Sequence, residues 1–212
     1  MRKKIGGMLF ERTALSRKSE KVVKREIDTL RKTDQVTPDL VFKDPYFLDF
    51  LGLRDHYVEK DVEDAILREM ELFLLELGAG FTFVARQKRI SVDNVDYYLD
   101  LLFFHRGLRR LVAIELKMDE FRPAYKGQME FYLHWLDRYE CKQAEGRPIG
   151  LILCAGKKDE TIELLELSKS GIRVAQYMTQ LPPRKIIEEK LHQAIRLAKL
   201  RLEQRKMITS DK

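Results

Sequence analysis

Apolar residues recur along the chain with two periods, which predict helices and strands in a definite order. Residues 58–77 predict a helix, because apolar side chains return every three or four positions, at Val62, Ile66, Met70, Phe73 and Leu77. Residues 81–90 alternate and are rich in Phe and Val, which indicates a strand that ends in a turn at DNVD. Residues 97–104 and 108–117 then predict a hairpin around Arg106-Gly107.

The second half of the chain continues with alternating helices and strands. Residues 124–143 predict a helix after Pro123, and residues 148–156 form a short apolar run typical of a covered strand. A helix over 159–168, a strand over 171–177 and a long helix after Pro182-Pro183 complete the pattern. The predicted order is α-β-β-β-α-β-α-β-α, an α/β fold with a mixed central sheet flanked by helices.

Three charged residues lie inside the apolar hairpin, where a buried unpaired charge is unfavourable by several kcal/mol. If residues paired across the hairpin sum to 213, Asp100 lies opposite Ala113 and shares a face with Glu115 and Lys117. Two neighbouring carboxylates without a His or Cys ligand suit Mg²⁺ or Mn²⁺, and a lysine beside them can act on a water or a phosphate. An ion-pair cluster that only stabilises the hairpin is the alternative.

Composition and charge narrow the choice of partners. The 212 residues, 44% hydrophobic, suit one domain with helical extensions, and the formal net charge of +6 is concentrated at the ends. Residues 1–40 contain 11 Lys and Arg against 6 Asp and Glu, and residues 183–212 contain 9 against 4. This distribution favours a polyanionic partner, with a solvated helix surface as the alternative.

Several classes of protein are excluded. Cys141 and Cys154 have neither disulfide-framework nor zinc-ligand spacing, which fits a reducing cytoplasm. No uncharged stretch is long enough to span a membrane, so no membrane partner is expected. The scattered histidines have no accompanying Ser or Cys motif, which argues against a hydrolytic triad.

Basic residues on the predicted strands and hairpin could hold a phosphate backbone: Arg86, Lys88, Arg89, Arg106, Arg109 and Arg110. Protection of a sheet edge from aggregation is the alternative role for them. Gln87 lies close enough to the hairpin to belong to the same set, and Lys126 follows on the next helix. The aromatic residues are predicted to be core rather than base-stacking side chains: Tyr97, Tyr98, Phe103, Phe104, Tyr132 and Trp135.

Five segments together resemble a known family: KDPYFLDFLGL, FLLELGAGFTFVARQKRI, LDLLFFHRGLRRLVAIELK, KGQMEFYL and IGLILCAGK. They are similar to the PD-(D/E)xK nuclease superfamily and, within it, to YhcG-type bacterial nucleases. The resemblance implies a restriction-endonuclease-like core in which Asp100 and Glu115 are metal ligands and Lys117 is the motif lysine. It also implies that Gln128 reaches the site and that Glu63 is the first-helix carboxylate and a metal ligand, although Glu59 and Glu69 also lie at the edge of the apolar stripe.

The resemblance also divides the chain. Residues 1–40 are expected to be a basic helical remnant of an N-terminal domain, residues 41–182 the nuclease domain, and residues 183–212 a basic C-terminal helix. The expected function is metal-dependent hydrolysis of phosphodiester bonds in nucleic acid, DNA rather than RNA, with homodimerisation left open. The alternatives are a non-catalytic module with the same fold that binds nucleic acid or docks a partner in a defence or mobile-element system, and a structural adaptor.

Overall fold

The computed structural model describes residues 36–51 and 58–179. Its first elements are α3 (Pro38–Val41), β1 (Tyr46–Phe47), η1 (Asp49–Leu51), α4 (Glu59–Arg68) and α5 (Met70–Leu77). They are followed by β2 (Phe81–Val92), β3 (Val95–His105), β4 (Arg110–Glu120), α6 (Ala124–Tyr139), β5 (Ile149–Gly156), α7 (Asp159–Leu164), η2 (Leu167–Ser170) and β6 (Ile172–Met178). The helix predicted over 183–212 and most of the extension predicted over 1–40 lie outside the described residues.

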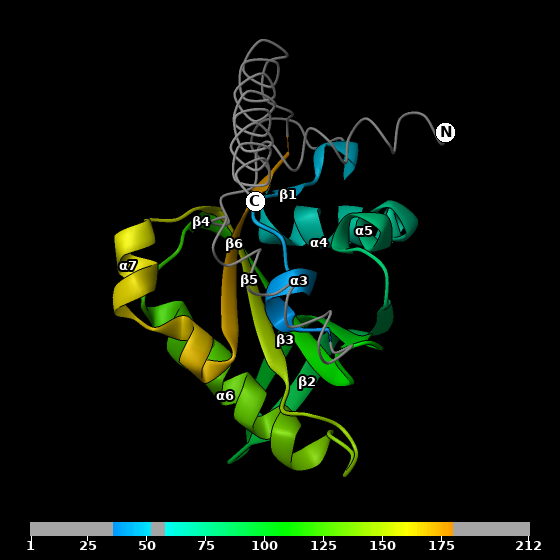
Figure 1. The fold of residues 1–212 in the computed structure, drawn as a ribbon, viewed down its shortest axis with the longest axis vertical. Helices are drawn as coiled ribbons and strands as arrows, with labels where there is room; N and C mark the ends of the chain where they lie inside the picture. Colours follow the sequence, from blue (N-terminus) through cyan, green and yellow to red (C-terminus); the bar gives the residue numbers. More distant parts are fainter. Residues whose placement is uncertain (1–35, 52–57, 180–212) are drawn as a thin grey trace, which may run out of the picture. The chain divides into compact units, whose positions relative to one another are not determined.

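Six strands form one mixed sheet in the order β1-β6-β5-β4-β3-β2 (Figure 1). The β2, β3 and β4 strands are antiparallel neighbours, whereas β4, β5, β6 and β1 pair in parallel. Helices α4 and α5 lie on one side of the sheet, and α6 and α7 lie on the other. This arrangement confirms the predicted α/β fold with a mixed central sheet.

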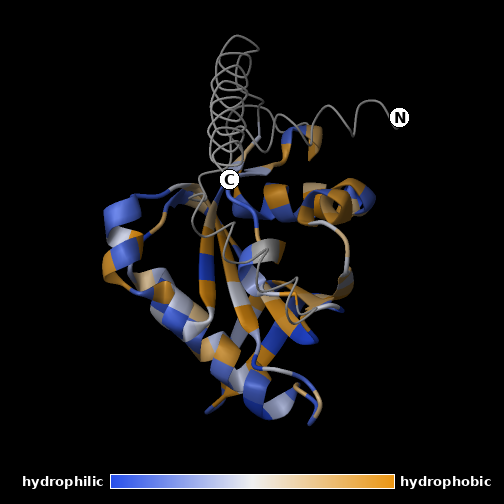
Figure 2. Cartoon of the chain, viewed as in Figure 1, coloured by the Kyte–Doolittle hydropathy of each residue, from blue (hydrophilic) through white to orange (hydrophobic). Residues whose placement is uncertain are grey.

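Each face of the sheet has its own apolar core, and the apolar residues in Figure 2 follow both faces. On the α4 face the core includes Val62, Ile66, Leu101, Ile114 and Leu116. On the α6 face it includes Ile90, Leu99, Leu102, Ala113 and Met129. A side chain can therefore be assigned to a face of the sheet by the core that it joins. Within the described residues, no helix combines the length and the apolar character needed to cross a membrane.

Some elements differ from the sequence-based expectation. The helix predicted over 58–77 is divided at Glu69, whose ψ of 32° departs from helical geometry, so that α4 and α5 are separate helices. The two-residue strand β1 was not predicted, because so short a segment has no recognisable period. It pairs in parallel with the end of β6 and forms one edge of the sheet.

The hairpin of β3 and β4 has a different register from the one predicted. His105 pairs with Arg110 and Leu102 pairs with Ala113, so the prediction that Asp100 faces Ala113 was wrong by two residues. The four-residue turn is held by the Leu108 N–H, which donates to Nδ1 of His105 at 3.0 Å. The backbone pairing of the two strands ends at Leu101 and Ile114. If the observed register is extended by one pair, Asp100 lies level with Glu115.

Candidate active site

The regular alternation of β2 and β3 is interrupted where the candidate site lies. In β3, Leu99 and Leu102 both join the α6-face core. Residues three positions apart on a regular strand face opposite sides of the sheet, so the alternation of side chains is broken between these two leucines. In β2, Gln87 has a φ of 43°, in the left-handed region, although both of its neighbours pair with β3. Asp100 and Gln87 are at the same level of the ladder, and the paired irregularity turns both side chains toward α4.

A polar cavity of about 610 Å³ lies between α4 and these two strands. In it the Gln87 amide donates from Nε2 to Oε2 of Glu63 at 2.7 Å and to Oδ1 of Asp100 at 3.2 Å. The other oxygen of Asp100 accepts the Leu116 N–H at 2.8 Å, at the point where the β3–β4 ladder has ended. Both oxygens of Asp100 are therefore held by the protein. The cavity is lined by Glu59, Lys60, Glu63, Asp64, Arg86, Gln87 and Asp100.

The prediction that Asp100 and Glu115 share a face of the sheet was wrong, although their charges are close enough to interact. Asp100 faces α4, whereas Glu115 is held from the α6 side of the sheet. Its Oε1 accepts the Lys117 ammonium at 3.1 Å and the Gln128 amide at 3.0 Å, and Gln128 belongs to α6. The second oxygen, Oε2, is buried and has no hydrogen-bond partner among the described residues. The carboxylate thus has one oxygen with two hydrogen-bond partners and one without a partner of normal geometry, while the nearby Asp100 N–H acts to lower the pKa of Glu115.

Burial and mutual repulsion shift the pKa values of the acidic groups. Burial, followed by the charge of Asp100, raises the pKa of Glu115 to about 8. Burial also raises the pKa of Asp100 and of Glu63, against the hydrogen bonds from Leu116 and Gln87. Burial alone would lower the pKa of Lys117, but the nearby Glu115 reverses this effect and the pKa is raised. The site therefore favours a cation that would relieve the carboxylate repulsion.

We expect the metal-free protein to lose stability as the pH rises toward about 8. The pKa of Glu115 moves from 4.5 to about 8 on folding, so the folded state retains a proton that the unfolded state has already released. This contribution is complete below pH 4.5 and is lost as the pH rises through about 8. Denaturant unfolding with EDTA present should therefore show a shallower pH dependence for Glu115→Gln than for the wild type. Parallel curves for the two proteins would contradict the shifted pKa.

The carboxylates of Asp100 and Glu115 have the chemistry that a divalent cation requires. Among the described residues, no three or more His, Cys, Asp or Glu side chains form a group that could hold a metal ion. Oε2 of Glu115 and the remaining lone pairs of Asp100 are hard oxygen donors of the kind that Mg²⁺ and Mn²⁺ prefer. Mg²⁺ keeps several water ligands when it binds, so two protein carboxylates suit it.

The three candidate glutamates of the first helix are placed differently. Glu63 is buried and is linked to Asp100 through Gln87. Glu59 lines the same cavity, and its Oε1 accepts the Met118 N–H at 3.3 Å. Glu69 is exposed at the junction of α4 and α5 and does not line the cavity.

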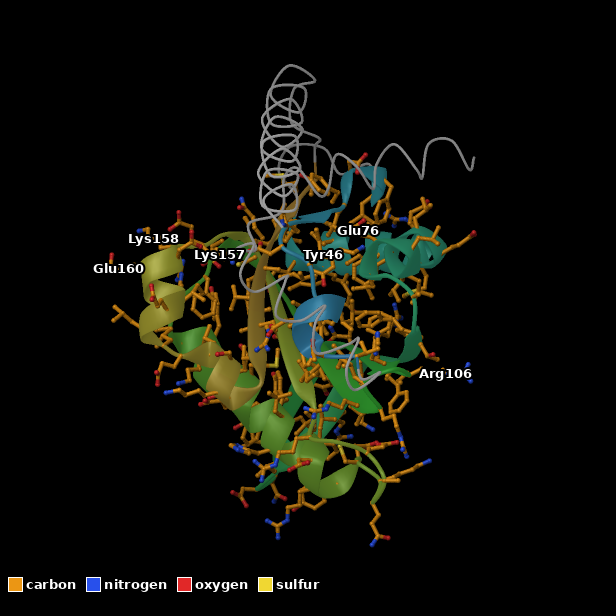
Figure 3. All side chains as sticks on the ribbon, in the orientation of Figure 1. Tyr46, Glu76, Arg106, Lys157, Lys158 and Glu160 are labelled. Atoms are coloured by element: carbon orange, nitrogen blue, oxygen red, sulfur yellow. The ribbon has the colours of Figure 1, made fainter. Side chains whose placement is uncertain are left out.

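The predicted nucleic-acid contacts are only partly brought to the site. Arg86 and Gln87 line the cavity, whereas Lys88 faces α6 and pairs with Glu140 at 2.6 Å. Arg89 pairs with Asp96 at 3.0 Å within its own hairpin. The remaining residues lie elsewhere: Lys126 pairs with Glu130 on α6, and Arg106, Arg109 and Arg110 lie at the β3–β4 turn, where Figure 3 shows Arg106 projecting outward.

Some aromatic residues were misjudged from the sequence. Tyr97 and Tyr98 were predicted to be core residues, but they are 38% and 49% exposed. Tyr132 is buried as predicted, and its hydroxyl also accepts the Gln128 amide at 2.9 Å and donates to the Tyr98 carbonyl at 3.2 Å. The ring of Tyr125 lies 5.3 Å from Nζ of Lys117. The spacing of four residues between Gln128 and Tyr132 on one helix was the available signal for their contact.

Comparisons with solved structures give low similarity. A repair endonuclease from Pyrococcus abyssi is 20% identical, with 61% of this chain and 50% of that chain covered and a TM-score of 0.38. EndoMS in complex with double-stranded DNA is 18% identical, with 56% and 46% covered and a TM-score of 0.40. TM-scores at this level carry no conclusion about function.

Comparisons with known sequences give higher identity than the comparisons with solved structures. The curated protein "Putative nuclease YhcG" of Escherichia coli (strain K12) is 34% identical over 192 residues, which is 90% of this chain and 50% of that protein. The chain therefore spans about half the length of this relative. The family model described as the YhcG PDDEXK nuclease domain matches residues 39–194, which include the sheet and the whole candidate site. The chain belongs to the YhcG PDDEXK nuclease domain family.

Proposed function

We propose that this protein is a metal-dependent nuclease that hydrolyses phosphodiester bonds in DNA with Mg²⁺ or Mn²⁺. The observation that carries the proposal is the unpartnered, buried Oε2 of Glu115 beside Asp100. A buried carboxylate oxygen without a partner is unfavourable by about 1–3 kcal/mol, and by more when it is charged. A bound cation would remove this penalty, whereas a structural adaptor or a pure binding module gains nothing from it.

Each side chain of the site has a distinct role in the proposal. Asp100 and Glu115 would hold the cation, which would lower the pKa of a bound water and offset phosphate charge. Lys117 donates to Oε1 of Glu115 and is 12% exposed, so that its ammonium can also orient a water or a phosphate oxygen. Gln128 fixes Oε1 of Glu115 and is itself held by Tyr132.

A nuclease assay with defined substrates tests the function. Circular single-stranded DNA, linear duplex DNA, branched DNA and RNA would each be incubated with and without Mg²⁺ or Mn²⁺. The proposal expects cleavage of DNA that requires the metal and that is absent in Asp100→Asn. Metal-independent cleavage, or equal activity in Asp100→Asn, would show that the carboxylates do not form the active site. Binding without cleavage of any substrate would support the non-catalytic module.

The basic ends of the chain should supply much of the non-specific affinity for DNA. We place the nuclease domain at residues 41–182 and the basic extensions at 1–40 and 183–212. The second extension contains 9 Lys and Arg against 4 Asp and Glu. Removing residues 184–212 should weaken DNA binding and reduce the slope of log affinity against log salt, by about 0.9 for every phosphate of duplex DNA that is no longer neutralised.

The salt titration should be accompanied by a measurement of oligomeric state and melting temperature. An unchanged salt slope in the shortened protein would mean that the charges of residues 184–212 do not bind phosphate. A change from dimer to monomer, with the slope retained, would assign these residues to dimerisation instead.

A further inference from the structure

Gln87 contacts two of the four carboxylates that border the polar cavity. Its Nε2 is 2.7 Å from Oε2 of Glu63 and 3.2 Å from Oδ1 of Asp100, so that one amide group connects α4 to β3. An amide N–H₂ group has two donor hydrogens, which allows both bonds to form at once. The amide therefore lies where two acidic groups would otherwise face each other without a partner.

The backbone of Gln87 supports this position at an energetic cost. Its φ of 43° lies in the left-handed region, although Arg86 and Lys88 on either side pair regularly with Leu101 and Leu99. A non-glycine residue in this conformation is strained and persists only where the surrounding structure holds it. Ala85 and Lys88 both face α6, so this local twist is what directs the Gln87 side chain to the α4 side.

The bond from Gln87 completes the orientation of the Asp100 carboxylate. The Leu116 N–H holds Oδ2 at 2.8 Å, and Gln87 holds Oδ1. With both oxygens bonded, the carboxylate plane cannot rotate freely, while each oxygen keeps a lone pair for a cation. Without Gln87, the plane would be held through Oδ2 alone.

We propose that Gln87 is a positioning residue for the metal site, rather than a contact to nucleic acid as its sequence context indicates. It acts through Asp100, which it orients, and it links that carboxylate to Glu63. The inference rests on the proposed function, because it requires Asp100 to bind a cation. Outer partners that orient metal ligands typically change metal affinity by about 10–100-fold when they are removed.

Calorimetric titration of the full chain with Mn²⁺ tests this role without any activity measurement. Gln87→Gly removes the amide and its two hydrogen bonds, but glycine adopts the left-handed backbone readily, which offsets part of the loss, so its metal-free melting temperature should fall only slightly. Its Mn²⁺ affinity should fall by about 10–100-fold. Gln87→Leu keeps most of the side-chain volume without a donor and should show the same loss of affinity.

Asn94→Gly is the matched control. Asn94 lies at the turn of the same hairpin with a φ of 62°, is exposed, and does not line the cavity. Its Mn²⁺ affinity should equal that of the wild type, and an equal loss in this variant would mean that the hairpin as a whole, not Gln87, was disturbed.

The remaining outcomes separate the inference from the proposed function. Wild-type affinity in Gln87→Gly, together with no binding by Asp100→Asn, would overturn the role of Gln87 and leave the metal site standing. A wild-type protein that binds no Mn²⁺ would overturn both.

Discussion

Lys117→Ala is expected to reduce the rate of phosphodiester hydrolysis by about 10²–10³-fold while most DNA binding is retained. The Lys117 ammonium is 3.1 Å from Oε1 of Glu115 and 5.3 Å from the ring of Tyr125, so it is held in a defined position inside the site. Charge on the phosphate increases in the transition state, and an interaction that strengthens there changes the rate more than the affinity. Single-turnover cleavage rates and DNA affinities, measured together, check this expectation.

The same variant distinguishes a catalytic lysine from a structural one. Breaking a buried ion pair usually costs about 3–5 kcal/mol, because the remaining charge is left without a partner. In this site the penalty should be smaller near neutral pH, because Glu115, with a pKa raised to about 8, can take up a proton instead. Full activity in a stable Lys117→Ala protein would refute both roles.

Lys157→Ala is a suitable control for the loss of a buried lysine. Lys157 is 8% exposed, pairs with Asp44 and donates to the Val174 carbonyl at 3.3 Å. The loss of this pair should lower the melting temperature without a comparable change in the cleavage rate per folded molecule. If Lys157→Ala lost as much cleavage activity as Lys117→Ala, the lower rate would reflect loss of folded protein rather than loss of a catalytic group.

Asp100→Asn is expected to abolish the stabilisation of the fold by Mg²⁺ or Mn²⁺. A ligand that binds only the folded state at 100 times its dissociation constant stabilises by about 2.7 kcal/mol, which corresponds to roughly 5–10 °C for a chain of this length. The wild type should show this gain in a thermal melt. Asn keeps an acceptor for the Leu116 N–H but loses the charge that attracts the cation, so its melting temperature should not respond to the metal.

Asp96→Asn provides the matched control in β3. Asp96 is an exposed carboxylate that pairs with Arg89 and accepts the Ser91 hydroxyl at 2.6 Å. Metal should stabilise this variant as much as the wild type. If metal stabilised neither variant, its effect on the wild type would depend on the overall negative charge of the protein rather than on Asp100. A wild-type melting temperature indifferent to metal would contradict the proposed site.

Local pattern in the sequence was sufficient to predict the main elements, and it also selected the residues of the candidate site. The periods of apolar residues predicted the strands and helices between residues 58 and 177. Two features of this part were missed: the break at Glu69, and the division of the helix predicted over 159–168 into α7 and η2. Asp100, Glu115 and Lys117 were selected because they are charged residues inside an apolar hairpin, where burial without a partner is unfavourable. These signals extend over a few residues and require no knowledge of distant contacts.

The face and the partners of each side chain were decided by tertiary structure. A strict period of two cannot anticipate the irregularities at Gln87 and Asp100, since each arises from how two paired strands meet α4. The register of β3 and β4 depended on a hydrogen bond from Leu108 to the His105 ring inside the turn. Lys88, predicted beside the nucleic acid, instead pairs with Glu140, because the altered alternation of β2 turns it toward α6.

The choice of Glu63 over Glu69 illustrates the same division. On a helical wheel both residues lie near the edge of the apolar stripe, so the sequence alone leaves them equivalent. In the folded protein the break at Glu69 ends α4, and only Glu63 is brought within 2.7 Å of the Gln87 amide. The sequence thus determined which residue types were available for chemistry. Packing of α4 against the irregular strands decided which of them meet, because a contact between residues far apart in the chain depends on the whole fold.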